Sequence, residues 1–471
     1  MRKLINKYLI AILIFTGVSC DSILDINPKN TITPEIALEG IDGYEALVFS
    51  VYRDLHRFNY FGQNQNLAPD ALADNLVIAN NTGRYTGHVV NAVGTHMNRW
   101  DRYTAINWAN IVIAGVDGVE ATQELKNQLK GEALFLRALS YHDLHKVHSY
   151  EPGKEVNGFN LGVILRTTPT NGLSEADFRA RSTNLEGYMQ MEASLLEAIS
   201  LLPSEGATTN FPHRASKTAA KALLARLYLY WGKYADAENY ADQVIAETSI
   251  NLLDGTNYED AWSATKHPES LFELNIQSVD WSTVDGVNNS MNSVSAKHDQ
   301  NYDETGGQFS VGGSDELINS FEAGDIRRNL WVDFGGNWEN RKWQGELGDY
   351  RENIPVIRLS EIYLISAEAK ARKGGADAAA QNRINELRAN RDLGNTTATG
   401  QALVDLIMNE RRVELCFEGH RWFDLKRNGM DISKTADSGV SPIPYSDFRI
   451  LAKIPSDQVF LNSLLEQNPN Y

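Results

Sequence analysis

Apolar side chains recur at helical spacing along most of the chain after residue 34. In residues 35–58 they fall at Ile41, Tyr44, Val48, Val51 and Leu55, which is the pattern of an amphipathic helix. The same spacing predicts helices within residues 101–148, 182–246 and 358–427. We therefore expect a mainly α-helical fold.

Two of these regions share a pattern of small and aromatic residues typical of tetratricopeptide-like helical hairpins. Residues 214–246 place Ala225 and Gly232 as such a repeat does, and residues 358–391 place Ala367 and Gly374 at the same spacing. Each helical pair buries one face on its neighbour, so these repeats predict a scaffold with no chemistry of its own.

Residues 58–100 and 250–357 interrupt the helical pattern. Both are long, polar and rich in aromatic residues, and loops of this length are uncommon unless they carry a function. Within the second, residues 330–334 and 337–344 flank Gly335 and Gly336, which predicts a small β-hairpin. We expect both insertions to face a ligand.

The charge balance narrows the possible ligands. The chain carries a formal net charge of -17, and its first nineteen residues include Arg2, Lys3 and Lys7 but no acid. Without them 41 basic and 61 acidic residues remain, for a net charge of -20. This excess disfavours nucleic acid, which needs basic patches, and favours neutral ligands or a cationic surface on a partner.

The start of the chain predicts export. Residues 1–19 combine basic residues, the short apolar run Leu9–Phe15 and small residues, as secretory signals do. Gly17–Cys20 resembles a bacterial lipobox, so Cys20 is the predicted lipidation site and residues 20–34 the predicted tether. The apolar run is too short to span a bilayer. With Cys20 lipidated, Cys416 would have no disulfide partner.

Residues 410–427 read ERRVELCFEGHRWFDLKR. The apolar spacing predicts a helix up to Gly419 and a bulky turn after it, with Arg411, Glu414 and Glu418 on one helical face. Buried ions must be paired, so we assign a structural role to the five residues Arg411, Glu414, Glu418, His420 and Arg421. A catalytic role for His420 with Asp424 or Glu418 is the alternative.

This stretch resembles the C-terminal signature of the SusD/RagB family of nutrient-binding lipoproteins. Trp100, Tyr103, Ile106 and Asn110 resemble a second family pattern, and the closing residues 453–471 a third. The resemblance implies a single SusD-like domain over residues 35–471. It also implies a lipid-anchored outer-membrane protein, exposed at the cell surface.

In that family the protein binds a nutrient, most often an oligosaccharide, and delivers it to a SusC-type TonB-dependent transporter as a non-catalytic lid. The resemblance thus implies no enzyme activity and no cofactor. Some members handle peptides. Ligand contacts come mainly from loops outside the helical scaffold, and no motif fixes which residues make them.

Flat aromatic side chains flanked by amides, carboxylates and guanidinium groups suit the apolar faces and hydroxyl rims of sugars. This reasoning selects candidates in both insertions, namely Tyr60, Asn64, Asp70, Asp74, Arg84, Tyr85, Asn98, Trp100, Trp281, Trp338 and Trp343. A place in the core is the competing interpretation for each tryptophan, and for Trp331 it is preferred.

Other chemistry has weaker support. No HExxH, GxSxG, P-loop or CxxC pattern is present. His142, His145 and His148 could ligate a metal, although an exposed polar helix face explains their spacing better. Residues 303–316 could hold calcium, although a flexible loop is the simpler interpretation. A glycoside hydrolase pair of carboxylates, or a pure assembly scaffold, are the remaining alternatives.

Overall fold

The computed structural model describes most of the chain after the predicted tether. The described residues are 38–94, 96–170, 172, 174–276, 290–295, 308–343, 345, 347 and 351–471. The predicted signal segment, Cys20, the tether and Trp281 lie outside them, as do residues 303–307 of the candidate calcium segment.

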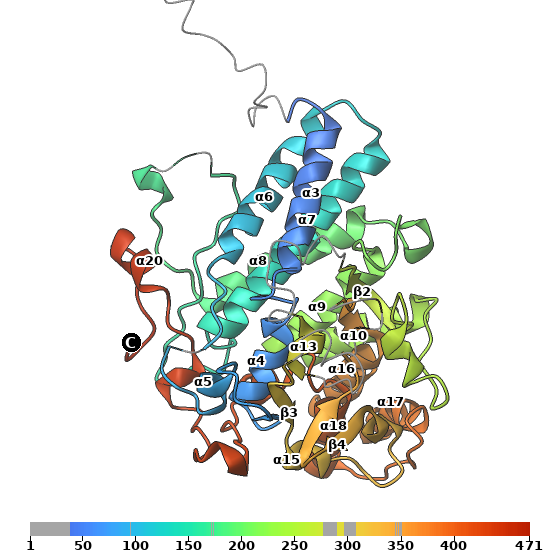
Figure 1. Ribbon diagram of the computed structural model, residues 1–471. Helices are drawn as coiled ribbons and strands as arrows, with labels where there is room; N and C mark the ends of the chain where they lie inside the picture. The colour runs from blue at the N-terminus through green and yellow to red at the C-terminus, as the bar shows by residue number, and fades with distance from the viewer. Residues whose placement is uncertain are drawn as a thin grey trace, which may run out of the picture.

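The prediction of a mainly helical chain is confirmed (Figure 1). The long helices fall where apolar spacing placed them. They are α3 (Ile41–Leu55), α6 (Arg102–Gly115), α7 (Gln123–His148), α8 (Asn184–Leu201), α9 (Lys217–Trp231), α10 (Tyr234–Glu247), α16 (Leu359–Arg372), α17 (Asp377–Ala389) and α18 (Gly400–Glu414).

These helices pack as successive hairpins, α6 on α7, α7 on α8, α9 on α10 and α16 on α17. Helix α10 also packs on α16, which joins the two predicted repeats although they are far apart in sequence. Gly232 ends α9 at φ 75° and Gly374 follows α16 at φ 77°, a left-handed conformation that glycine adopts without a Cβ penalty. The tetratricopeptide-like hairpins are therefore confirmed.

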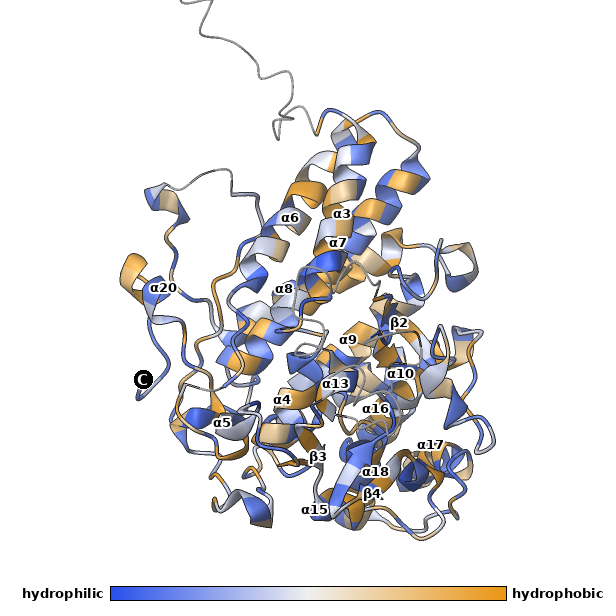
Figure 2. Ribbon diagram, in the orientation of Figure 1, coloured by the Kyte–Doolittle hydropathy of each residue, from blue (hydrophilic) through white to orange (hydrophobic). Residues whose placement is uncertain are grey.

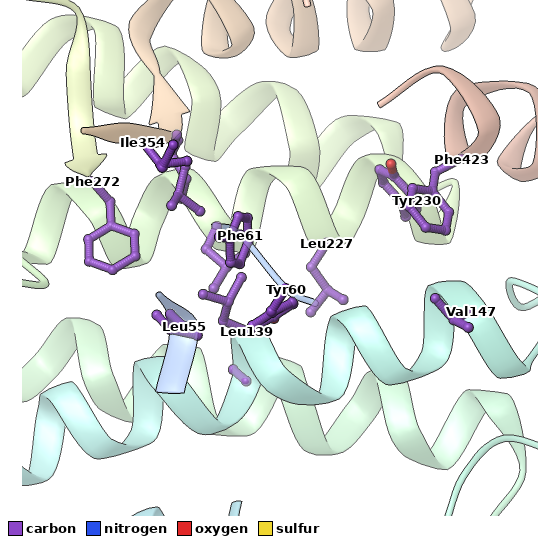
Figure 3. Close-up of a cluster of buried hydrophobic side chains, with 14 of the residues drawn as sticks. Leu55, Tyr60, Phe61, Leu139, Val147, Leu227, Tyr230, Phe272, Ile354 and Phe423 are labelled. Carbon is purple, nitrogen blue, oxygen red and sulfur yellow. The ribbon is translucent and has the colours of Figure 1, made fainter. Parts of the chain in front are cut away.

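Helix α7 is the central element of the first half. Its residues from Ala133 to His148 are all buried, because α3, α6, α8 and the following loops cover it on every side. Figure 2 shows the mixed hydropathy of the scaffold helices, and Figure 3 shows α7 residues Leu139 and Val147 in the core beside side chains from α9 and the β-strands.

The expectation of an exposed histidine face on α7 is wrong. His142, His145 and His148 are each at most 1% exposed, and burial lowers the pKa of all three. His142 and His145 contact the rings of Tyr230 and Tyr188. The three histidines are therefore neutral core residues. A helix that is buried on all sides has no contrast between an apolar and a polar face, so apolar spacing could not predict their burial.

Two small antiparallel sheets complete the fold. The first has the order β1 (Leu76–Ile78), β3 (Val311–Gly313), β5 (Asn337–Asn340), β4 (Trp331–Phe334), and the second pairs β2 (Ser270–Leu274) with β6 (Ile354–Arg358). Strands β4 and β5 form the predicted hairpin.

The insertions also contain short helices that the sequence did not predict. These are α4 (Asn64–Leu72), α5 (Thr86–Val89), α13 (Met291–Ser295) and α15 (Asp315–Ile318). Helix α4 is buried along almost its whole length. Its sequence is rich in amide and acidic residues, which do not have the apolar spacing that predicts a core helix. Among the described residues, no helix is both long and apolar enough to cross a membrane.

Candidate functional site

The signature folds differently from its predicted helix and turn. Helix α18 ends at Glu414, Phe417 and Gly419 adopt φ values of 62° and 85°, and a new helix α19 (Arg421–Arg427) replaces the expected turn. A Cβ at Gly419 would lie 2.2 Å from the Gln65 carbonyl oxygen of α4. Glycine is therefore required where the signature passes closest to the first insertion.

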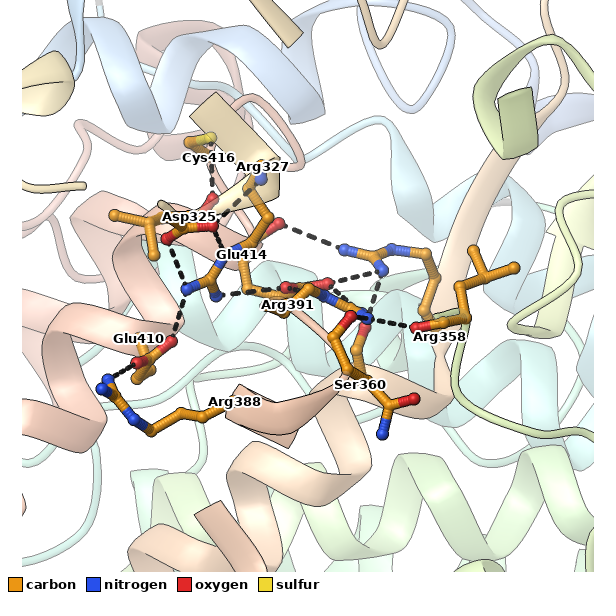
Figure 4. A network of polar contacts seen from close by, with 12 residues as sticks. Asp325, Arg327, Arg358, Ser360, Arg388, Arg391, Glu410, Glu414 and Cys416 are labelled. Atoms are coloured by element: carbon orange, nitrogen blue, oxygen red, sulfur yellow. Dashed lines mark hydrogen bonds and ion pairs between the residues drawn. The ribbon is translucent and has the colours of Figure 1, made fainter. Parts of the chain in front are cut away.

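Glu414 lies at the centre of a buried ion cluster (Figure 4). Its carboxylate accepts hydrogen bonds from Arg391 at 2.9 and 3.0 Å, from Arg358 at 3.1 Å and from Arg327 at 3.2 Å. The side chains of these four residues are at most 1% exposed. Glu414 has a pKa well below its usual range; burial opposes this shift, but the neighbouring arginines outweigh it.

The other signature residues also pair in the interior. Glu418 binds Arg358 at 2.8 Å and Lys342 at 2.7 Å, Arg411 binds Asp424 at 3.2 Å, and Arg421 binds Asp74 at 2.6 Å.

His420 is half-buried. Burial holds its pKa well below the usual range, against the opposing charge of Glu361. These contacts support a structural role for the signature.

The two insertions meet in the four-stranded sheet. Strand β1 of the first insertion pairs with β3 of the second, with Leu76 opposite Gly313 and Ile78 opposite Val311. A Cβ at Gly313 would lie 2.5 Å from the indole of Trp331, so a side chain there would displace that buried ring. Segments more than two hundred residues apart thus form one sheet.

Polar side chains gather where β1 leads into residues 80–84, of which 80–83 are exposed and Arg84 is half-buried. Arg84 Nε donates to the Gln308 side-chain oxygen at 2.8 Å, and Asn80 Nδ2 donates to the Gln308 carbonyl oxygen at 3.2 Å. The hydroxyls of Thr82 and Ser310 are 2.7 Å apart. Guanidinium, amide and hydroxyl groups from both insertions are therefore held together, as recognition of a ligand rich in hydroxyls requires. We call these five residues the junction cluster.

Trp338 lies half-buried on β5 of the same sheet. Its Nε1 donates to Asp315 at 2.8 Å, and the Arg328 guanidinium lies 4.3 Å from the ring centroid. The indole is thus fixed by two neighbours while part of it stays accessible, which suits an aromatic platform.

Other predicted ligand residues are core residues in the structure. Tyr60 is fully buried and donates its hydroxyl to Asp143, while Trp343 is 1% exposed and donates its indole N–H to the Phe417 carbonyl oxygen at 3.2 Å. Tyr85 is 7% exposed and donates to Gln63 at 3.0 Å. Their polar tips are satisfied inside the protein, so they offer no face to a sugar.

The two predicted acids of the first insertion are buried as well. Asp70 is fully buried and accepts from Asn75 at 2.7 Å and from the Phe417 amide at 3.2 Å; burial raises its pKa to about 7. Asp74 is 5% exposed and pairs with Arg421. Both contact the signature instead of solvent.

Three candidates of the first insertion lie elsewhere. Asn64 is half-buried and accepts from Arg99 at 3.2 Å. Asn98 is exposed and Trp100 is 7% exposed, and both line a groove of about 600 Å³ beside α6. They are not grouped with the junction cluster.

Two buried carboxylates with raised pKa values are the candidates for a glycoside hydrolase pair. Burial raises the pKa of Glu273 to about 7 and that of Glu352 to about 8, and both line one small cavity with Trp262. That cavity has a volume of about 10 Å³, which is close to the space of one water molecule and far below that of a sugar ring.

Sequence reasoning missed Gln308, Asn80, Thr82 and Ser310 of the junction cluster. They carry no periodic or motif signal, and only the pairing of β1 with β3 brings them together. Among the described residues, no group of three or more histidines, cysteines or acids is arranged to hold a metal ion.

Comparison with known proteins agrees with this architecture. The family model described as "SusD family" matches residues 225–471, and one described as "Starch-binding associating with outer membrane" matches residues 39–229. SusD-like protein P2 of Formosa agariphila is 24% identical, with 99% of this chain and 100% of that protein covered. The starch-binding protein SusD of Bacteroides thetaiotaomicron is 26% identical over 77% of this chain and 76% of its own length.

Solved structures show the same fold. A SusD superfamily protein of Bacteroides thetaiotaomicron has a TM-score of 0.79 and 27% identity, covering 92% of this chain and 100% of that one. A laminarin-binding SusD-like protein has a TM-score of 0.74 and 26% identity, again over 92% and 100%. The family model that spans the signature covers more than half of the sequence. The chain therefore belongs to the SusD family.

Proposed function

We propose that this protein binds a neutral oligosaccharide at the cell surface through the junction cluster and Trp338, and delivers it to a SusC-type TonB-dependent transporter. The observation that carries the proposal is the meeting of the two insertions in one sheet, which holds Arg84, Thr82 and Gln308 together. The laminarin-binding and starch-binding relatives support a carbohydrate as the ligand class.

The charge of the protein supports a neutral ligand. With a net charge near -20 after loss of the first nineteen residues, the surface as a whole repels acidic glycans. Amide and hydroxyl groups bind neutral hydroxyls in either hydrogen-bonding direction, and a tryptophan face covers the apolar C–H face of a sugar. The junction cluster and Trp338 provide both kinds of group.

Binding without turnover is part of the proposal. The buried pair Glu273 and Glu352 has no room for a sugar. We propose that Cys20 carries the lipid anchor at the outer membrane and that the protein acts as the lid of its transporter. Release of reducing ends from a bound glycan would instead favour the glycoside hydrolase alternative, and capture of peptides the peptide-binding one.

Calorimetry on the soluble chain that starts after Cys20 tests the ligand site. Laminarihexaose and maltoheptaose serve as neutral probes, with Arg84→Ala and Trp338→Ala as variants. Each change should weaken binding about tenfold, because one lost charge-assisted hydrogen bond or stacking contact contributes about 1–3 kcal/mol. Arg53→Ala, on the exposed side of α3, is the matched control and should bind as the wild type does.

Melting temperatures separate loss of a contact from loss of the fold. Normal binding by both site variants would refute the junction cluster as the site. Absence of binding to every neutral probe by the wild type would refute the oligosaccharide assignment itself. Co-purification of a TonB-dependent transporter with the lipidated protein tests the partner.

A further inference from the structure

Helix α20 (Ser456–Leu461) approaches the segment after α7 at the side of the molecule (Figure 1), and a groove lies between them. This groove, which we call the α6–α20 groove, has a volume of about 600 Å³, within the range of small-ligand sites. Three segments distant in sequence line it. They are residues 98–104 at the start of α6, the four residues Ile164, Arg166, Asp177 and Phe178, and residues 455–465.

Hydrogen bonds hold the three walls of the groove together. Tyr103 donates its hydroxyl to the Ile164 carbonyl oxygen at 2.8 Å, which ties α6 to the second wall. Asn462 Nδ2 donates to the Arg179 carbonyl oxygen at 2.9 Å, which ties the third wall to the second. The rings of Trp100 and Tyr103 pack edge-to-face, with their centroids 5.2 Å apart. The groove is therefore formed before any ligand binds, which lowers the cost of binding.

Helix α20 packs Val459 against the core but leaves its other apolar side chains exposed. None of its residues is buried. Phe460 is 88% exposed, Leu461 is 64% exposed and Leu464, just beyond the helix, is 55% exposed. Exposed apolar side chains clustered beside a preformed groove are typical of a binding surface. Leu461 lines the groove, whereas Phe460 does not.

The lining chemistry indicates the ligand class. Tyr103 and Phe178 are half-buried and supply aromatic surface, and Asn98 and Gln458 supply accessible amides, while Trp100 and Asn462, each 7% exposed, are buried in the wall of the groove. Three aspartates, Asp101, Asp177 and Asp457, line the groove with a single cation, Arg166, which already pairs with Asp177 at 3.3 Å. Asp101 pairs with Arg102 at 2.8 Å. The excess of acid repels anionic ligands, while aromatic surface beside amides suits an uncharged sugar.

We propose that the α6–α20 groove is a second saccharide subsite, which binds a neutral stretch of one to a few sugar units. It is separate from the junction cluster, since none of the five cluster residues lines it. The inference rests on the proposed function in its ligand class. It adds a second point of attachment, so that one long glycan could be held at two places at once, which raises overall affinity without new contacts at either site.

Saturation-transfer NMR with laminaritriose and maltotriose tests the groove, because trisaccharides limit bridging between sites. In an Arg84→Ala, Trp338→Ala background we expect residual saturation transfer. Adding Phe178→Ala with Leu461→Ala should reduce that signal at least tenfold. Phe460→Ala is the matched control on the same helix, and it should leave the signal unchanged because Phe460 lies outside the groove.

A second variant keeps the test valid if the first lowers the melting temperature. Thr104 is exposed on the α6 wall, so Thr104→Trp fills the groove without removing a packed side chain, and it should abolish the residual signal.

The possible failures are distinguishable. If the junction variants alone abolish all binding and the groove variants change nothing, the subsite is refuted while the proposed function stands. If Phe460→Ala reduces the signal as much as the combined Phe178→Ala and Leu461→Ala change, the exposed helix surface and not the groove is responsible, which also overturns the subsite. If the wild type binds neither trisaccharide nor any longer neutral probe, the subsite and the proposed function both fail.

Discussion

Replacing Glu414 by glutamine tests the buried ion cluster most directly. The change keeps the shape of the side chain but removes one negative charge from contact with Arg327, Arg358 and Arg391. It also turns an N–H₂ group toward one of these guanidinium groups, all of which are donors. All three arginines stay buried, so water cannot replace the lost charge.

The expected loss of stability follows from the remaining pairs. Arg327 keeps Asp325 and Glu410, while Arg358 and Arg391 keep Glu269. Because every arginine retains a carboxylate, we expect a cost of about 3–5 kcal/mol, as for one broken buried pair, and not a multiple of it. With an unfolding entropy of about 2.1 cal/mol/K per residue, this corresponds to a melting temperature lower by about 3–5 °C.

Differential scanning calorimetry at pH 7.5 measures the change. Glu247→Gln is the matched control, since Glu247 also binds a cation, Lys221 at 2.6 Å, but its side chain is 48% exposed. An exposed pair contributes at most about 1 kcal/mol, so this control should melt within about 1 °C of the wild type. Equal melting temperatures for the two variants would refute the claim that burial makes the cluster essential.

Three further predictions concern titration and anchoring. Burial lowers the pKa of His142, so the native state holds the neutral imidazole. Below about pH 6.5 the unfolded state binds a proton that the native state does not, and stability therefore declines as pH falls. In thermal melts, His142→Phe should lose less stability than the wild type between pH 7.5 and 5. Burial raises the pKa of Glu352 to about 8, so ionisation of the same group in the unfolded state lowers stability as pH rises from about 4.5. Glu352→Gln should therefore gain in melting temperature relative to the wild type from pH 5 to 8. A difference that stays constant over this range would contradict the assignment. Cys20→Ala should move the protein from the membrane fraction to the soluble fraction, and retention in membranes at high salt would show another anchor.

The scaffold was predictable because its information is local. Helical spacing and the glycines that end α9 and follow α16 depend on neighbouring residues, so both hairpins could be placed from sequence. Helix α7 marks the limit of this reasoning. A helix covered on all sides has no polar face, and its three histidines were assigned to solvent although they lie in the core.

The proposed binding site was less predictable because it depends on long-range pairing. The approach of residues 76–84 to residues 308–313 rests on backbone bonds between β1 and β3, which no local pattern encodes. Composition identified both insertions as unusual, yet it could not separate Trp343, which packs under the signature, from Trp338, which stays accessible. Polar or aromatic character alone does not tell which side of a loop a residue will face.

The signature contacts both insertions. Towards the first insertion, Arg421 binds Asp74 and the Phe417 amide donates to Asp70. Towards the second, Glu418 binds Lys342 and Glu414 binds Arg327. Both insertions are thus fixed to one short stretch of chain between α18 and α19. In the proposed site, the signature would position the two insertions, and the junction cluster would contact the ligand. The residues that identify the family and those proposed to bind the ligand are therefore different sets, because the first set positions the segments that carry the second.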